Sequence, residues 1–254
     1  MSNLNDKVAL VTGATGGIGF EVAKRLGKDG YTVLLNGIED AAGAERVQEL
    51  MAAGITAEYF GFDVTNEDEV TSNMSAIGKK YGKIDVLVNN AGGLGGRSRF
   101  EEMTTDFYRF VMALNLDSVF FASRAAIPFL KKGKNASIIN YTSNAGWNAG
   151  GPGAGIYGTS KAGVHAITRA LAKDLAEYGI RVNAVSPGTI DTPFHAQIKE
   201  SKPEVFASWK NNIMLGRLGQ PQEVASVVSF LASNDAAFIT AETIQIGGGQ
   251  ALGI

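Results

Sequence analysis

The sequence predicts an α/β fold: a single doubly wound parallel sheet of about seven strands, flanked by helices on both faces. Short apolar segments rich in β-branched residues alternate with amphipathic segments from residue 8 to residue 246, which is the pattern of such a sheet. Polar or glycine-rich residues follow most of the apolar segments. Because ligands bind outside the carboxyl ends of parallel strands, we expect these residues to converge on one edge of the sheet.

The first apolar segment, residues 8–12, is followed by a glycine-rich turn at 13–19 and then by an amphipathic helix. Glycines allow the backbone of such a turn to approach a pyrophosphate, whose charge the amides at the helix N-terminus meet. The turn therefore predicts a dinucleotide phosphate site. The alternative is a tight turn that binds nothing.

Strands and helices are expected to alternate along the rest of the chain. Asn66 has the character of a helix N-cap, and Pro128 is expected to bend the end of a long helix. No linker or repeat divides the chain, so one domain is predicted over residues 1–254. Strands are predicted at 31–35, 57–62, 84–88, 136–141, 180–186 and 243–246, helices at 41–53, 67–81, 105–132 and 222–232, and a glycine-rich loop at 146–155 that leads into a further helix.

Composition excludes several classes of function. Of the 254 residues 45% are hydrophobic and 19% charged, as in ordinary globular proteins, and the net charge of −2 gives no electrostatic reason to expect nucleic acid or an anionic membrane as a partner. With no cysteine and two histidines, we expect neither a disulfide nor a metal site. The N-terminus lacks the apolar region of a signal peptide and no run approaches about 18 apolar residues, so a cytoplasmic protein is expected.

Tyr157 and Lys161 lie four residues apart in a predicted helix, so their side chains share one face. A phenol titrates near pH ~10, and a fixed positive charge within ~4–6 Å lowers that pKa. The pair is therefore expected to form a tuned general acid/base. The alternative is an ordinary surface helix.

Several motifs occur in the same order as in the short-chain dehydrogenase/reductase family, which the whole chain resembles. They are the Thr-Gly-x-x-x-Gly-x-Gly turn at Thr12, Gly13, Gly17 and Gly19 with Gly16 beside it, Asn-Asn-Ala-Gly at 89–92, a helix asparagine at Asn115, a strand-end serine at Ser143, Tyr157 with Lys161, and Pro187-Gly188. The resemblance implies a Rossmann-type NAD(P)-dependent oxidoreductase that interconverts a secondary alcohol and a carbonyl.

In that family's mechanism, Tyr157 would exchange a proton with the substrate oxygen while hydride passes to or from the nicotinamide. Lys161 would lower the pKa of Tyr157 and bind the nicotinamide ribose, and Ser143 would hold the substrate oxygen. Asn115 would kink its helix and position a water for proton relay. The alternatives are a strand-end cap for Ser143 and a locally bonded helix residue for Asn115.

The resemblance also implies which residues bind the cofactor. Gly37 stands where NAD-specific relatives often carry an aspartate, and Ile38 where NADP-dependent relatives often carry an arginine. Thr15 and Gly16 supply no basic residue for a 2′-phosphate, so NAD is favoured and NADP is not excluded. The expected contacts are Gly13, Thr15, Gly16, Gly17, Ile18, Gly19, Gly37, Ile38, Asp63, Val64, Asn90, Ala91, Gly92, Tyr157, Lys161, Pro187, Gly188, Ile190 and Thr192.

A substrate lid is expected at about residues 189–216, again by resemblance. Arg97 or Arg99 is a hypothetical ligand for the carboxylate of a sugar acid or keto acid, with Asn148 for a hydroxyl, the alternative being exposed loop arginines. A sugar acid or polyol ranks before a 3-oxoacyl or 3-hydroxybutyrate-type substrate. A dinucleotide-sensing scaffold is the non-enzymatic alternative.

Two further expectations concern histidine and assembly. His165 is expected to be a packing residue and His195 an exposed residue of the lid. The family commonly forms homotetramers, so one is expected here. Ala241 replaces a glycine that is usual in the family.

Overall fold

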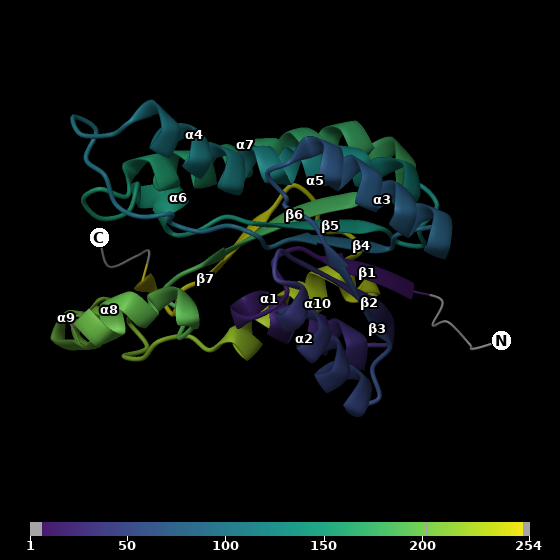
Figure 1. Ribbon diagram of the computed structural model, residues 1–254, viewed down its shortest axis with the longest axis horizontal. Coiled ribbons are helices and arrows are strands. Elements are labelled where there is room, and N and C mark those ends of the chain that lie inside the picture. The colour runs from purple at the N-terminus through teal and green to yellow at the C-terminus, as the bar shows by residue number, and fades with distance from the viewer. Residues whose placement is uncertain (1–6, 202, 251–254) are drawn as a thin grey trace.

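The computed structural model describes residues 7–201 and 203–250 and contains one seven-stranded sheet in which every pairing is parallel. The strand order is β3-β2-β1-β4-β5-β6-β7, so the chain reverses direction across the sheet between β1 and β4 (Figure 1). The predicted fold class is confirmed. The strands are β1 (Lys7–Val11), β2 (Tyr31–Gly37), β3 (Ala57–Gly61), β4 (Val86–Asn89), β5 (Ser137–Tyr141), β6 (Arg181–Pro187) and β7 (Thr243–Ile246).

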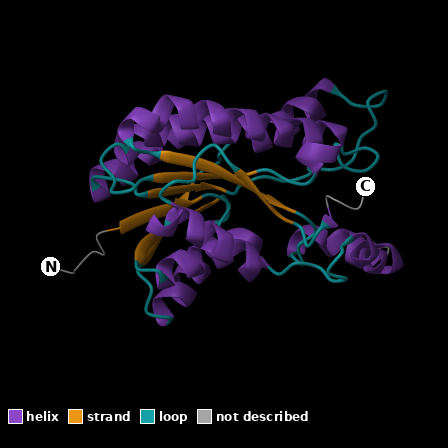
Figure 2. Ribbon diagram, turned by 180° about the vertical axis from the view of Figure 1, so that it is seen from behind, coloured by secondary structure: helices purple, strands orange, loops and turns teal. Residues whose placement is uncertain are grey.

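Helices cover both faces of the sheet (Figure 2). One face carries α1 (Gly17–Lys28), α2 (Asp40–Ala52) and α10 (Pro221–Ala232). The other carries α3 (Glu67–Tyr81), α4 (Thr105–Met112), α5 (Ser118–Leu130) and α7 (Gly155–Leu175). Each face buries its own apolar cluster, because alternate residues of the strands point to opposite sides. Asn66 caps α3 as predicted, accepting from the main-chain N–H groups of Asp68 and Glu69.

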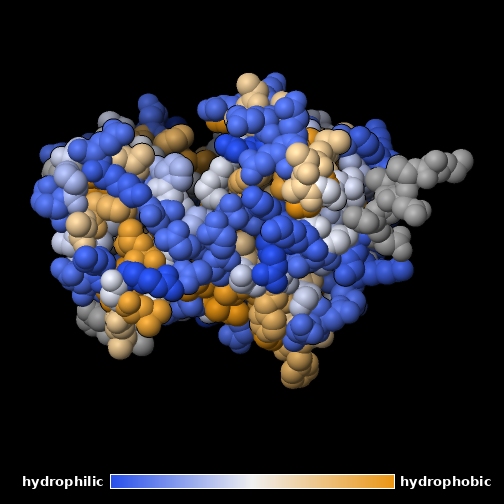
Figure 3. Space-filling model, turned by 90° about the horizontal axis from the view of Figure 1, so that it is seen from below, coloured by the Kyte–Doolittle hydropathy of each residue, from blue (hydrophilic) through white to orange (hydrophobic). Residues whose placement is uncertain are grey.

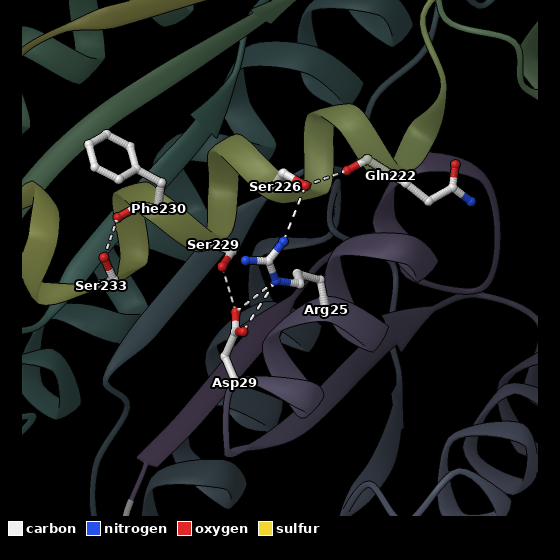
Figure 4. Close-up of polar contacts among 7 residues, drawn as sticks. All are labelled: Arg25, Asp29, Gln222, Ser226, Ser229, Phe230 and Ser233. Carbon is white, nitrogen blue, oxygen red and sulfur yellow. Dashed lines mark hydrogen bonds and ion pairs between the residues drawn. The ribbon is translucent and has the colours of Figure 1, made fainter.

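Helices α1 and α10 are joined by a polar network at their outer edge (Figure 4). Arg25 donates to Asp29 at 3.2 Å and to the Ser226 hydroxyl at 3.2 Å, and Ser229 donates to Asp29 at 2.5 Å. The two contacts to Ser226 and Ser229 link residues 201 and 200 positions apart in sequence. They fix α1, the helix that begins at the glycine-rich turn, against α10.

Two local predictions on the upper face need correction. The segment 146–155 is not entirely a loop, since Ala145–Asn148 forms the short helix α6, which ends at Ala149 with a φ of 62°. The helix predicted over 105–132 ends at Leu130 and contains a π turn, η1 (Ala113–Asp117). Asn115 explains the wider turn, because its side-chain amide donates to the Val111 carbonyl four residues earlier.

The continuous helical stretch Thr105–Leu130 is long and apolar enough to cross a membrane by length and composition alone, with a mean hydropathy of 1.4. It nevertheless packs on the sheet through Ala122, Ala126 and Leu130, and α5 lies against α3. The stretch is therefore a core helix of this fold.

The segment after β6 forms a separate lobe of short helices that flanks the carboxyl ends of the strands (Figure 1). Seen from below, the surface is hollowed beside this lobe, and hydrophobic side chains gather on it among polar ones (Figure 3). The helices of the lobe are η3 (Pro193–His195), α8 (Ala196–Ser201), α9 (Pro203–Ser208) and η4 (Trp209–Asn212). Outside the lobe, the 3-10 turns η2 (Ala176–Tyr178) and η5 (Asn234–Ala236) follow α7 and α10.

Candidate active site

A cleft of about 730 Å³ opens at the carboxyl ends of the strands, where the sequence pattern places the polar segments. It runs from the glycine-rich turn, past the start of α7, to the lobe of short helices. Most of the predicted site residues line it, namely Gly13, Thr15, Gly16, Gly17, Ile18, Gly19, Asn90, Gly92, Ser143, Tyr157, Lys161, Pro187, Gly188, Ile190 and Thr192.

The glycine-rich turn has the geometry of a phosphate cradle. Gly13 and Gly17 adopt φ angles of 61° and 54°, which side chains disfavour, and a Cβ on Gly19 would lie 2.4 Å from the Gly13 carbonyl oxygen. At the N-terminus of α1, Gly16 provides no side-chain cap. The first amides of the helix are thus available to an anion, as a dinucleotide pyrophosphate requires.

The Asn-Asn-Ala-Gly segment braces this turn. The Thr12 hydroxyl accepts from the main-chain N–H groups of Asn90 and Ala91 at 3.1 and 3.0 Å, and the Asn90 amide donates to the carbonyls of Thr12 and Gly13 at 2.9 and 3.0 Å. Asn89 instead donates to Asn140 of β5 and to Ser123 of α5. The segment therefore holds the turn rigidly in place.

Helix α7 brings Tyr157 and Lys161 to the end of β5. A side-chain hydrogen bond joins Tyr157 to Ser143, and the Lys161 ammonium lies 5.8 Å from the Tyr157 ring centroid. Lys161 is buried and donates to the Tyr141 main-chain carbonyl at 2.9 Å. Burial lowers the pKa of Lys161 to about 8, because removing an ammonium from water disfavours its charged form.

The pKa of Tyr157 differs from the sequence expectation. Burial raises it above the ordinary value, and the hydrogen bond from Ser143 opposes that rise. Desolvation of the phenolate thus outweighs the hydrogen bond from Ser143, which favours the phenolate. The pKa of Tyr157 is therefore raised in this structure, and the lowering effect expected from Lys161 stays a prediction.

Asn115 lies beneath the cleft and does not line it. Its side chain is fully buried, accepts from the Gly93 N–H at 3.0 Å and donates to the Gly93 carbonyl at 2.8 Å. A Cβ on Gly92 would lie 2.8 Å from the Asn115 Oδ1 and 3.0 Å from the Lys161 Nζ. The glycine therefore allows the π turn and Lys161 to approach each other.

The residues expected around the adenosine lie beyond the cleft, at the ends of β2 and β3. Gly37 packs against Thr15, whose methyl carbon would be 2.5 Å from a Cβ at position 37. Ile38 is 75% exposed and Val64 is buried, while Asp63 accepts from the Thr65 hydroxyl and N–H at 2.8 Å each.

Sequence reasoning missed Arg46 of α2, which donates to the Thr15 carbonyl at 3.3 Å. Arg46 therefore places a cation beside the glycine-rich turn, whereas position 38 is a neutral isoleucine. Its charge is met by Glu49 at 2.7 Å and Glu45 at 3.9 Å. No sequence pattern indicated Arg46, because it lies 31 residues from Thr15 in the chain.

The far wall of the cleft contains Gln250, which no motif indicated, together with the predicted candidates Arg97 and Asn148. Gln250 accepts from the Thr189 N–H at 2.9 Å and from the Asn144 amide at 3.3 Å, which ties the start of the lobe to the C-terminal turn. Arg97 lines the cleft and donates to the Pro152 carbonyl at 2.9 Å, whereas Arg99 does not line it. Asn148, His195, Trp209 and Asn212 line it as well.

His195 is half-buried, and its ring lies 5.2 Å from that of Trp209 and 5.9 Å from that of Phe206. Burial first, and then the charge of Lys199, lowers its pKa. This aromatic group forms the inner side of the lobe, so the expectation of an exposed histidine is only partly met.

Known proteins match this chain over nearly its whole length. A family model described as enoyl-(acyl carrier protein) reductase matches residues 13–251. The 3-oxoacyl-(acyl-carrier-protein) reductase FabG of Thermotoga maritima is 37% identical over 246 residues, which cover 97% of this chain and 98% of that protein.

Two solved structures are similar in fold and sequence. The aldohexose dehydrogenase of Thermoplasma acidophilum has a TM-score of 0.88 and 36% identity, covering 99% of this chain and 96% of that one. The NADH-dependent reductase A1-R′ responsible for alginate metabolism has a TM-score of 0.87 and 37% identity, covering 98% and 99%. Fold, cleft and relatives together place this chain in the short-chain dehydrogenase/reductase family, whose members are NAD(P)-dependent oxidoreductases acting on alcohols and carbonyls.

Proposed function

We propose that the protein is an NAD(H)-dependent oxidoreductase that interconverts a small secondary alcohol and its carbonyl, with Tyr157 as general acid/base. The observation that carries this proposal is that Ser143, Tyr157 and Lys161 line the same cleft as the glycine-rich turn. A dinucleotide-sensing scaffold would need only the turn. A scaffold would not need the acid/base group that this chain also contains, namely Asn115, Ser143, Tyr157 and Lys161.

In the reducing direction, Ser143 and Tyr157 donate hydrogen bonds to the substrate carbonyl oxygen and so favour negative charge developing on it. The nicotinamide, when bound, supplies the hydride. The Tyr157 proton passes to that oxygen, and the raised pKa of Tyr157 keeps the proton available at neutral pH. Lys161 then stabilises the phenolate, and the π turn at Asn115 contributes to proton return.

The cofactor proposal is NAD in preference to NADP. Ile38 is exposed and neutral where a 2′-phosphate would need a cation, and Arg46 is paired with Glu49. One similar structure is that of an NADH-dependent reductase. The pyrophosphate would lie on the amides of the glycine-rich turn, with Asp63, Val64 and Gly37 around the adenosine.

The substrate proposal is a sugar acid, keto acid or polyol. Arg97, Asn148 and Asn212 give the outer cleft polar donors suited to carboxylate and hydroxyl groups. The similarity to an aldohexose dehydrogenase is in line with this class. A 3-oxoacyl reductase is the second candidate, favoured by the match to FabG of Thermotoga maritima.

Residues 189–216 would act as a lid over the substrate within a single domain. The exposed aromatic residues Tyr108, Phe110 and Phe120 on α4 and α5 support a homotetramer in which these helices meet their counterparts. A cytoplasmic location completes the proposal.

The experiment combines NADH or NADPH with a panel of sugar acids, keto acids, diketones and acetoacetyl esters and follows absorbance. Tyr157→Phe is run in parallel, since it should abolish turnover while NADH binding is retained. Substantial activity of Tyr157→Phe would overturn the mechanism. Binding of NADH without turnover of any compound would favour the scaffold.

A further inference from the structure

The side chain of His165 occupies a position that packing alone does not explain. The residue is 7% exposed, and its ring touches two hydroxyls: Nε2 lies 2.9 Å from the Thr142 Oγ1, and Nδ1 lies 3.1 Å from the Thr243 Oγ1. A neutral imidazole offers one donor and one acceptor, so these two partners satisfy it completely. His165 thus joins α7 to both β5 and β7.

Thr142 is the residue directly before Ser143, and its hydroxyl accepts from the Ser143 main-chain N–H. Ser143 in turn orders the turn that follows, since its hydroxyl accepts from the Ala145 N–H at 3.2 Å and its carbonyl accepts from the Gly146 N–H at 2.8 Å. The imidazole therefore contacts the group that fixes the backbone of the serine.

Three side chains on one face of helix α7 contact the three consecutive residues 141–143. Tyr157, Lys161 and His165 are spaced four apart, and they bond in turn to Ser143, to the Tyr141 carbonyl and to the Thr142 hydroxyl. The end of β5 is held from the same side by the same helix face that carries the acid/base. Distances within the site thus depend on all three contacts.

The neighbouring turn is built to accommodate the imidazole. A Cβ on Gly146 would lie 2.9 Å from the His165 Nε2, and the Trp147 ring covers the imidazole at 4.3 Å between centroids. Burial, followed by the charge of Arg169 on the same helix, lowers the pKa of His165, while Thr142, Thr243 and Trp147 are uncharged. The lowered pKa favours the neutral ring at physiological pH, and the two hydroxyls can each donate or accept as its tautomer needs.

We propose that His165 is a positioning residue for the reaction: through Thr142 it fixes Ser143 in the orientation that bonds the Tyr157 phenol and the substrate oxygen. This rests on the proposed function of Ser143 and Tyr157. Displacement of a reacting group by ~1 Å can lower a rate by ~100-fold, so loss of this contact should be visible in kcat.

Three substitutions separate the contact from packing. His165→Phe keeps a ring without hydrogen bonds, His165→Gln places an amide near the former Nε2, and His165→Asn places one near the former Nδ1. We expect kcat to fall ~10–100-fold in His165→Phe and His165→Asn, with KM for NADH unchanged. In His165→Gln, kcat should recover substantially. Equal rescue by Asn and Gln, or full activity of Phe, would overturn the proposal.

Thr168→Val is the matched control. Thr168 is buried on the same helix and accepts from Asn140 of β5 at 3.0 Å, so its replacement removes a comparable α7–β5 bond farther from Ser143. The stability of the Thr168→Val protein should fall as in His165→Phe, while its kcat is retained. In the double variant with Thr142→Val, the Phe substitution should cause no further loss in kcat, whereas additive losses would indicate separate roles.

A readout without turnover keeps this test independent of the proposed function. The absorbance titration of the Tyr157 phenol, taken as the difference from Tyr157→Phe, should move to higher pH in His165→Phe and stay in place in Thr168→Val. An unmoved titration would count against the positioning role. Retained turnover in Tyr157→Phe would instead remove the proposed function, whatever His165 does.

Discussion

The Lys161 ammonium donates to the main-chain carbonyl of Tyr141 at 2.9 Å, so the residue that lies beside the acid/base also holds the end of β5. This single bond gives a buried cation its partner. Burial lowers the pKa of Lys161 to about 8, so its protonation state changes within the pH range of enzyme assays.

Turnover should therefore depend on pH through Lys161. As pH rises through about 8 the ammonium loses its proton and no longer stabilises the phenolate, so the rate of carbonyl reduction should decline. Lys161→Met should lack this inflection and show kcat lowered by ~100-fold. A pH profile of kcat for both proteins at saturating NADH checks this, and an inflection near 8 that persists in Lys161→Met would assign it elsewhere.

The same residue predicts the pH dependence of stability. The pKa of Lys161 is below its ordinary value of 10.5 in the folded protein, so between about 8 and 10.5 the unfolded chain binds more protons. The free energy of unfolding should accordingly rise with pH in that window relative to Lys161→Met. Urea unfolding at pH 7.5 and 9.5, values chosen roughly to bracket the folded pKa, measures the difference.

The fold followed from sequence because it depends on local periodicity. All seven strands lie within about two residues of their predicted ends, and the polar residues after them meet in one cleft, since parallel strands end on one edge. The spacing of Tyr157, Lys161 and His165 was also visible, but not the hydroxyls that His165 contacts. Its partner Thr243 lies 78 residues away.

Other features of the site required the tertiary structure. The π turn follows from an Asn115 side chain that competes for a backbone carbonyl, and the raised pKa of Tyr157 follows from burial. Arg46 and Gln250 reach the cleft region from 31 and 61 residues beyond their main-chain partners. No periodicity or motif encodes such contacts.

The glycine at position 37 should resist conversion to the aspartate of NAD-specific relatives. A Cβ there would lie 2.5 Å from the Thr15 methyl, so Gly37→Asp alone should displace the glycine-rich turn and weaken NADH binding. Adding Thr15→Ser removes that methyl and should restore binding. Fluorescence titration with NADH compares the two, and tighter binding by Gly37→Asp alone would contradict the steric argument.

Ile38→Arg should shift cofactor preference toward NADPH. The position is 75% exposed and follows β2, and a charge-assisted bond to a phosphate is worth ~1.5–3 kcal/mol, or roughly 10–100-fold in kcat/KM. The value for NADH should change little. Ile38→Gln is the uncharged control, and an equal gain in that variant would exclude a charge effect.

Ala241 should be a site where glycine stabilises the protein. Its φ is 65°, a left-handed conformation that carries a penalty of ~1–2 kcal/mol in residues with a Cβ. After the entropy of glycine in the unfolded chain is subtracted, Ala241→Gly should raise the free energy of unfolding by ~0.5–1 kcal/mol. Ala237→Gly is the control, because Ala237 is exposed with a φ of −59° and should lose stability.

Arg97→Ala should distinguish a ligand for substrate carboxylate from a brace of the loop. Arg97 lines the cleft and donates to the Pro152 carbonyl, so its loss removes both a cation and a loop contact. A role in binding predicts KM raised ~10-fold or more for acidic carbonyl substrates, with neutral ones nearly unchanged. Arg99→Ala, outside the cleft lining, should alter neither class. Equal losses on both classes in Arg97→Ala would show that the arginine braces the loop alone, since a lost brace acts on every substrate that enters the cleft.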